Sequence, residues 1–268
     1  MKIRLFNYDQ RLLARSLSGN NKRNDGIYEG KDKKIYKKYN MRFLFKWIKY
    51  KLFNKKGIFY PKFVNRWYEY HQSNLRGSID EIKKRQSIYL PYIKKSKKPF
   101  LEIGFGRGEF LEIVKKAGIK NIEGVDLNYL FYKSAKEKGF NVYHSDALEF
   151  LYLSSKTFSG ISAFHFIEHL EFPQLFDFLL MCSKKIEKGG TLILETPNIA
   201  NLQVSSINFH YDFSHVLKIP PVLLKYLLKF FGFSEIKFLY LHPMKGKLKT
   251  ETDKLIYGAQ DLGVIAIK

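Results

Sequence analysis

The chain has 268 residues, 45% of them hydrophobic, and a formal net charge of +22. This length suits one large α/β domain with an extension and excludes two full-sized α/β domains. The single cysteine, Cys182, excludes a disulfide framework and a thiolate metal site; without an apolar leader or a run of roughly 20 apolar residues, we expect a cytoplasmic protein.

Residues 1–60 predict a basic N-terminal extension. They hold 17 Lys and Arg against 4 Asp and Glu, so they contribute +13 to the net charge. Residues 36–56 interleave aromatic side chains with eight basic ones, which predicts an amphipathic helix. Such a helix could contact an anionic membrane at its inner face, or pack on the domain with its lysines in water. The charge alone also suits nucleic acid or a solvated tail.

Residues 61–97 predict two helices that lead into the main domain. Ser78 and Glu81 have the spacing of a capping box, which predicts that the second helix begins there. Pro91 should kink or end that helix. Arg76 and Arg85 lie on either side of the helix start.

From residue 98 to residue 268, apolar runs alternate with helical patterns, which is typical of a parallel sheet. The predicted strands are 99–103, 121–126, 140–144, 160–164, 191–196, 234–241 and 261–267. The predicted helices are 108–117, 129–138, 147–153, 172–187 and 221–231, with a loop over 197–218. We therefore predict an α/β domain with a Rossmann-like, doubly wound, mostly parallel sheet of seven strands.

A glycine-rich turn follows the first strand. The glycines at 104, 106 and 108 can adopt backbone angles closed to other residues and allow a ligand to approach the chain. The spacing differs from the G-x-G-x-x-G of dinucleotide-binding folds, and Glu102 inside the strand suits a ligand with a cationic amino group. Asp126 ends the second strand, where a carboxylate can accept hydrogen bonds from both ribose hydroxyls of an adenosine.

The stretch from Glu102 to Gly108 resembles the E/D-x-G-x-G-x-G motif of class I S-adenosylmethionine-dependent methyltransferases. The resemblance implies S-adenosylmethionine as cofactor and methyl transfer as the activity. It implies that cofactor contacts come from Glu102, Gly104, Phe105, Gly106, Asp126, Leu127, Asp146, Ala147, Phe164 and Arg85. Asp146 would bind the adenine amino group, or it could simply cap the helix that follows it.

Residues 76–91 resemble the R-G-S-x-x-E-I-K-x-R-x-x-x-Y-L-P segment of a subset of bacterial methyltransferases associated with surface-polysaccharide (O-antigen type) biosynthesis. Runs similar to that subset's I-E-H-L, E-T-P-N and F-Y-x-D-x-(S/T)-H follow strands four and five. The resemblance implies a hydroxyl acceptor on a sugar or lipid-linked glycan. Arg76 and Arg85 could there reach the cofactor's carboxylate or an anionic acceptor.

Histidines and acids gather in the segments after strands four and five. His169, next to Glu168, is the first candidate for a general base because imidazole titrates near neutral pH; His215 is the second. A divalent metal is an open alternative, held by Glu168, His169 and His215, with His165 and Asp212 also available. We interpret His144 and His242 as structural residues.

Other functions stay open at this point. The (D/N)-P-P-(Y/F) tetrapeptide of enzymes that methylate base amines is absent. RNA 2'-O-methylation is favoured by the net charge, but the sequence contains no recognisable RNA-binding module, so nucleic acid is the weaker partner prediction. A non-catalytic module that binds a membrane or a glycosyltransferase is the alternative from another class.

Overall fold

The computed structural model describes residues 60–268, except residues 95, 245 and 247–248. The predicted basic extension and its amphipathic segment 36–56 lie outside the described residues. Residues 62–268 belong to one unit, so the helices after residue 62 and the sheet can be discussed together. None of the helices within this described range is long and apolar enough to cross a membrane.

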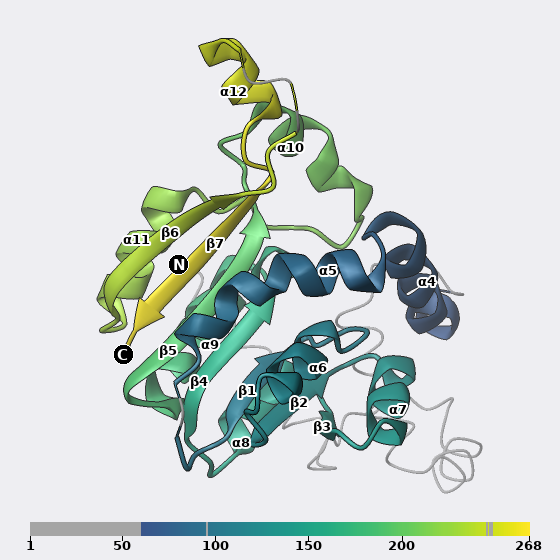
Figure 1. Cartoon of the computed structure of the whole chain (residues 1–268), viewed down its shortest axis with the longest axis vertical. Helices are drawn as coiled ribbons and strands as arrows, with labels where there is room; N and C mark the ends of the chain where they lie inside the picture. Colours follow the sequence, from purple (N-terminus) through teal and green to yellow (C-terminus); the bar gives the residue numbers. More distant parts are fainter. Residues whose placement is uncertain (1–59, 95, 245, 247–248) are drawn as a thin grey trace, which may run out of the picture. The chain divides into compact units, whose positions relative to one another are not determined.

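Seven strands form one sheet in the order β3-β2-β1-β4-β5-β7-β6 (Figure 1). β1 to β5 are parallel, whereas β7 runs antiparallel to both β5 and β6. The strands are β1 Phe100–Ile103, β2 Ile122–Asp126, β3 Asn141–His144, β4 Phe158–Phe164, β5 Ile186–Pro197, β6 Ser234–Leu241 and β7 Asp261–Ile267. The predicted doubly wound fold is confirmed. The strand order reverses between β1 and β4, where sheets of this kind bind ligands beyond the carboxyl ends of their strands.

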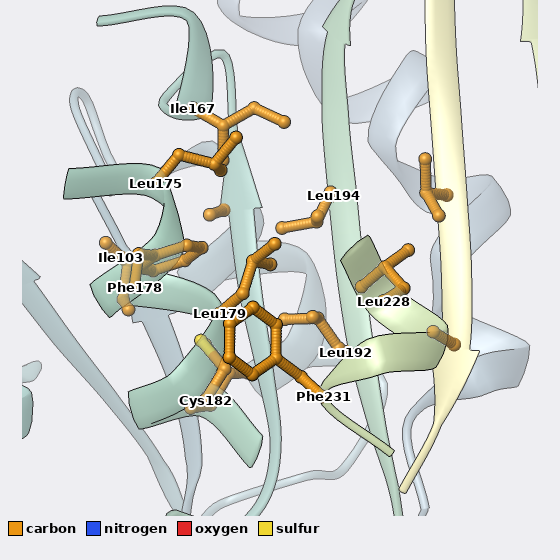
Figure 2. Close-up of a cluster of buried hydrophobic side chains, with 14 of the residues drawn as sticks. Ile103, Ile167, Leu175, Phe178, Leu179, Cys182, Leu192, Leu194, Leu228 and Phe231 are labelled. Carbon is orange, nitrogen blue, oxygen red and sulfur yellow. The ribbon is translucent and has the colours of Figure 1, made fainter. Parts of the chain in front are cut away.

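Helices cover both faces of the sheet, and β1 and β4 are accordingly buried along their whole length. One face is covered by α8 Ala147–Leu153, α9 Phe172–Lys185 and α11 Pro221–Phe230. Figure 2 shows side chains of this layer, with Phe178 of α9 drawn beside Ile103 of β1 and Leu179 drawn nearer to Leu192 of β5. The other face is covered by the 3₁₀ helix η1 Ser87–Tyr92, by α6 Glu109–Lys116 and by α7 Tyr129–Glu137.

Two helices precede the sheet, as predicted: α4 Tyr60–Leu75 and α5 Ile79–Gln86. The predicted capping box is only half formed. Ser78 Oγ accepts from the Glu81 amide at 3.2 Å, but the Glu81 carboxylate pairs with Arg85 instead of reaching back. Pro91 lies inside η1, which continues from the end of α5.

Arg107 and Asn128 hold this helix pair, residues 62–86, against the sheet. The Arg107 guanidinium donates to the carbonyl oxygens of Gln72, at 3.2 Å, and Gly77, at 3.1 Å, beyond the glycine turn. Asn128 Nδ2 donates to the Asn65 carbonyl at 3.0 Å. The helix pair is therefore fixed next to the carboxyl ends of β1 and β2.

Some boundaries were predicted wrongly. α9 ends at Lys185 and β5 begins at Ile186, whereas the sequence predicted a helix to 187 and a strand from 191. Gly190 therefore lies inside β5, where a Cβ atom would approach the Ser159 carbonyl to 2.5 Å. Two short helices within the predicted loop 197–218 were missed: α10 Leu202–Ser206 and η3 Asn208–Tyr211. A third missed helix, α12 Glu251–Tyr257, lies between β6 and β7. These helices are too short for hydrophobic periodicity to reveal them.

Candidate active site

The glycine turn and Asp126 form one hydrogen-bonded unit at the switch point of the sheet. Gly104, Gly106 and Gly108 all have positive φ angles, of 64°, 54° and 84°. The Gly106 amide donates to Asp126 Oδ2 at 2.8 Å, and the Asn128 amide donates to Oδ1 at 2.7 Å. Each carboxylate oxygen keeps a second lone pair for a ligand hydroxyl. Burial raises the pKa of Asp126 to about 6, in spite of these two amides.

Glu102 is buried in β1, with 2% of its surface exposed. Its Oε2 has no hydrogen-bond partner among the described residues. Burial, followed by repulsion from Glu109, raises the pKa of Glu102 well above its usual range, while the Arg76 charge opposes the shift. A buried acceptor with no partner fits the cationic amino group that the motif implies.

Arg76 lies over the glycine turn, because a Cβ atom at Gly106 would be 3.2 Å from its Nη1. The neighbouring Gln72 side chain accepts from the same guanidinium at 3.4 Å. Arg76 attracts both Glu102 and Asp126 electrostatically. The structure thus brings together three predicted site residues around the turn, while Arg85 lies further along α5 in its ion pair with Glu81.

The other predicted cofactor residues differ in exposure. The Phe105 side chain is buried in the core, in space that exists because residue 124 is glycine: a Cβ atom there would be 2.8 Å from the Phe105 ring. Only the Phe105 backbone is therefore available to a ligand. Asp146 Oδ1 caps α8 by accepting hydrogen bonds from the Leu148 and Glu149 amides. The capping role that the sequence allowed for Asp146 is therefore observed. Leu127 is exposed and Ala147 is buried.

A cavity of about 300 Å³ adjoins the glycine turn. It lies between the helix pair and the ends of β4, β5 and β7, and its lining includes Gly104, Phe164, Arg85, His169 and His215, all predicted site residues. This cavity is the candidate site for the methyl acceptor.

Glu168 is a fully buried carboxylate beside this cavity. His165 Nδ1 lies 3.2 Å from its Oε1, and the Thr196 hydroxyl donates to its Oε2 at 3.1 Å. Burial alone would raise the pKa of Glu168, but the hydrogen bond from His165 and the nearby His169 and His215 lower it to about 2. Glu168 is therefore ionised at neutral pH.

His169, on the 3₁₀ helix η2 Ile167–His169, belongs to a chain of hydrogen bonds. Its Nδ1 lies 2.8 Å from Ser214 Oγ, and Ser214 donates to Asp212 Oδ1 at 2.6 Å. Because Ser214 donates its one proton to Asp212, it accepts from His169 Nδ1–H. In the neutral form of the His169 ring, Nε2 is therefore the unprotonated nitrogen. Tyr68 of α4 also hydrogen-bonds to Ser214, which links the helix pair to this chain.

The Nε2 atom of His215 turns its lone pair toward Glu168. Its Nδ1 is 2.7 Å from the Phe209 carbonyl oxygen, which can only accept, so Nδ1 carries the proton in the neutral ring. Burial lowers the pKa of His215 and so favours this neutral form, although Glu168 opposes the shift. Nε2 then lies 3.8 Å from Glu168 Oε1. Ligand atoms of Glu168, His169 and His215 lie within 4.8 Å of one another, so the predicted trio is brought together.

A second polar cluster was not predicted as a unit. His165, which has a positive φ of 50°, places Nε2 3.4 Å from Glu195 Oε1 and 3.7 Å from Asp261 Oδ1. Tyr89 donates to the other oxygen of Glu195, and His242 Nδ1 lies 2.8 Å from Asp261 Oδ2. Burial lowers the pKa of His165, but its hydrogen bonds to Glu168 and Glu195 outweigh this and raise the pKa well above its usual range.

The second cluster depends on the antiparallel pairing of β5 and β7, in which Pro197 lies opposite Asp261. This pairing brings the start of β7 beside the end of β5. Glu195 stood in the E-T-P-N run of the sequence, but no local pattern marked Asp261 as its neighbour.

A family model described as a methyltransferase domain matches residues 71–234, more than half of the chain. The chain belongs to this methyltransferase family. This methyltransferase is 33% identical to a SAM-dependent methyltransferase from Archaeoglobus fulgidus, with a TM-score of 0.69 over 75% of this chain and 100% of that chain. No curated protein was found to match the sequence.

Two more distant structures share the fold of this methyltransferase. The methyltransferase domain of bacterial CtHen1 is 15% identical, with a TM-score of 0.52 over 71% of this chain and 100% of that chain. An S-adenosylmethionine-dependent methyltransferase from Clostridium acetobutylicum is 12% identical, with a TM-score of 0.52 over 76% of this chain and 98% of that chain. The family and the Archaeoglobus relative identify an S-adenosylmethionine-dependent methyltransferase.

Proposed function

We propose that this methyltransferase acts on a hydroxyl of a sugar or lipid-linked glycan in surface-polysaccharide biosynthesis. The observation that supports a hydroxyl acceptor is the hydrogen-bond chain from Asp212 through Ser214 to His169. A hydroxyl must lose its proton as it is methylated and therefore needs a positioned base. The surface-polysaccharide context rests on the resemblance of residues 76–91 and of the runs after β4 and β5.

The chain's own residues fit S-adenosylmethionine. The buried Glu102 carboxyl, whose Oε2 has no hydrogen-bond partner among the described residues, suits its amino group; Asp126 suits the ribose hydroxyls, and Asp146 suits the adenine amino group. The glycine turn leaves room for the backbone to approach. When bound, the cofactor supplies an electrophilic methyl group on a sulfonium.

On the acceptor side, the Nε2 atom of His169 accepts the proton that the acceptor hydroxyl loses. Ser214 accepts the hydrogen bond from Nδ1–H of His169. Through this serine, the ionised Asp212 carboxylate stabilises the imidazolium that forms on His169. Arg76 and Arg85 line the same cavity and suit a phosphate or diphosphate on the acceptor. Glu195 and Asp261, also in the lining, can accept hydrogen bonds from sugar hydroxyls.

A metal-assisted version of this reaction is favoured by one observation. His215 donates Nδ1–H to a backbone carbonyl and turns Nε2 toward the Glu168 carboxylate, an arrangement typical of histidines that bind metal ions. A divalent ion on Glu168, His169 and His215 would lower the pKa of a bound hydroxyl. Titration with S-adenosylhomocysteine and transfer assays, each with and without EDTA, separate the two versions: chelation abolishes turnover only if a metal takes part.

RNA 2'-O-methylation is the alternative, supported by the net charge of +22. The test is to incubate the full chain with radiolabelled S-adenosylmethionine and, separately, a lipid-linked glycan extract and total RNA. We expect label in the glycan fraction, and none with His169→Ala. Label in RNA alone would overturn the glycan proposal. No S-adenosylhomocysteine binding at all would leave a non-catalytic module as the better explanation.

A further inference from the structure

Helix α11 is apolar around its whole circumference except for two lysines. Leu224, Leu227 and Leu228 are buried against the sheet. The opposite side exposes large apolar side chains, with exposed fractions of 65% for Val222, 41% for Leu223, 66% for Tyr226 and 73% for Phe230. A helix that is apolar on all sides is typical of a buried position. The exposed side therefore indicates a surface that meets a partner.

These four residues, which we call the α11 face, form a continuous stripe. Val222, Tyr226 and Phe230 follow one another at four-residue spacing and so lie one above the other on the helix. Lys225 and Lys229 lie three residues after Val222 and Tyr226 and border the stripe with positive charge. Residues 213–234 contain no Asp or Glu. Figure 1 shows α11 beside β6, at the edge of the sheet.

The charge on the α11 face discriminates between partners. In a two-fold symmetric dimer through this face, Lys225 and Lys229 would approach the same lysines of the second copy. Residues 1–60 of the chain itself carry a net charge of +13, which would likewise oppose their binding beside these lysines. An anionic bilayer offers an apolar interior beneath negative headgroups, which complements both the stripe and the lysines.

We propose that the α11 face rests in the interface of an anionic membrane. Val222 and Phe230 would enter the acyl boundary, while Tyr226 can keep its hydroxyl among the headgroups. Lys225 and Lys229 would extend to the lipid phosphates. This proposal rests on α11 alone and does not depend on the nature of the methyl acceptor.

The test uses a fluorophore at Phe230. Cys182 is the single cysteine and is buried, so Phe230→Cys in the full chain can be labelled selectively with nitrobenzoxadiazole. Leu153→Cys on α8 is a matched control, because Leu153 is 71% exposed. With vesicles of phosphatidylglycerol and phosphatidylcholine, we expect a brighter, blue-shifted emission at position 230 and no change at position 153. Vesicles of phosphatidylcholine alone should give little change.

Other results would overturn the proposal. Unchanged emission at position 230 would mean that the α11 face stays in water. Emission that is already blue-shifted without vesicles would mean that protein covers the face, with a dependence on protein concentration indicating a second copy. As an independent measurement, the double variant Tyr226→Ser with Phe230→Ser should bind anionic vesicles about tenfold more weakly, whereas Tyr152→Ser with Leu153→Ser should not. Equal loss in both pairs would also contradict the proposal.

Discussion

Replacing Glu102 with glutamine should separate cofactor binding from stability. Burial raises the pKa of Glu102 well above its usual range, which favours the neutral form of this carboxyl in the empty protein. Glutamine has the same shape and no charge, and we expect the melting temperature to stay the same or rise slightly. A hydrogen bond between charged groups is worth about 1.5–3 kcal/mol, so the affinity for S-adenosylhomocysteine should fall about 10- to 150-fold.

Proton release gives the same prediction a second measurement. A carboxyl with a raised pKa is protonated before binding, and a ligand ammonium group favours its ionised form. Binding should therefore be accompanied by release of a proton from Glu102, which calorimetry in buffers of different ionisation enthalpy measures. The glutamine variant should lose the part of the release that belongs to Glu102. Wild-type affinity in the variant would refute the assignment of Glu102 to the amino group.

A matched control for this experiment is Glu123→Gln. Glu123 is also buried; it belongs to the neighbouring strand β2, where it lies opposite Leu101 of β1. Its carboxylate pairs with Lys156 at 2.7 Å, so glutamine should lower the free energy of unfolding there. Cofactor affinity should be unchanged. The two variants are thus expected to show opposite patterns.

Further predictions concern Asp126, the acceptor cavity and the packing of Phe105. Asp126→Ala leaves the Gly106 and Asn128 amides without acceptors, so denaturant unfolding should show a loss of about 2–5 kcal/mol and calorimetry no binding of S-adenosylhomocysteine. His169→Ala should still bind S-adenosylhomocysteine, and its rate of methyl transfer should fall about 10²- to 10⁴-fold. Ser214→Ala should lower the rate of methyl transfer about fivefold. An unchanged rate in His169→Ala would indicate that His215 is the base instead. Gly124→Ala should cost about 1–3 kcal/mol of stability through its clash with Phe105, and the added Phe105→Leu should recover part of it; no recovery would contradict the packing described.

The positions of the strands along the chain and the glycine turn were predictable because they depend on local patterns. Apolar runs, glycine spacing and the acid at the end of β2 are all readable within about thirty residues, the length of one βαβ unit. The presence of a phenylalanine at position 105, within the glycine turn, was not explained by its neighbours in sequence. Its explanation is Gly124, which lies on the next strand and leaves room for the ring.

The acceptor cavity was predicted only in part. Glu168, His169 and His215 were identified from the runs that contain them, and the structure brings their ligand atoms together. Tyr68 and Asp261 were missed, because each reaches the cavity through a tertiary contact with a distant segment. Sequence periodicity carries no information on such pairings.

The place of β7 in the sheet has a consequence for the order in which the protein assembles. Among the strands that the structure describes, β6 pairs only with β7, and β7 lies between β5 and β6. During synthesis, β6 therefore leaves the ribosome before its partner strand exists, and the edge of β5 stays unpaired. A chain made as far as residue 258 has neither this pairing nor Asp261. When β7 emerges after β6, it joins β5 to β6 and, in the same step, adds Asp261 to the carboxylates of the acceptor cavity.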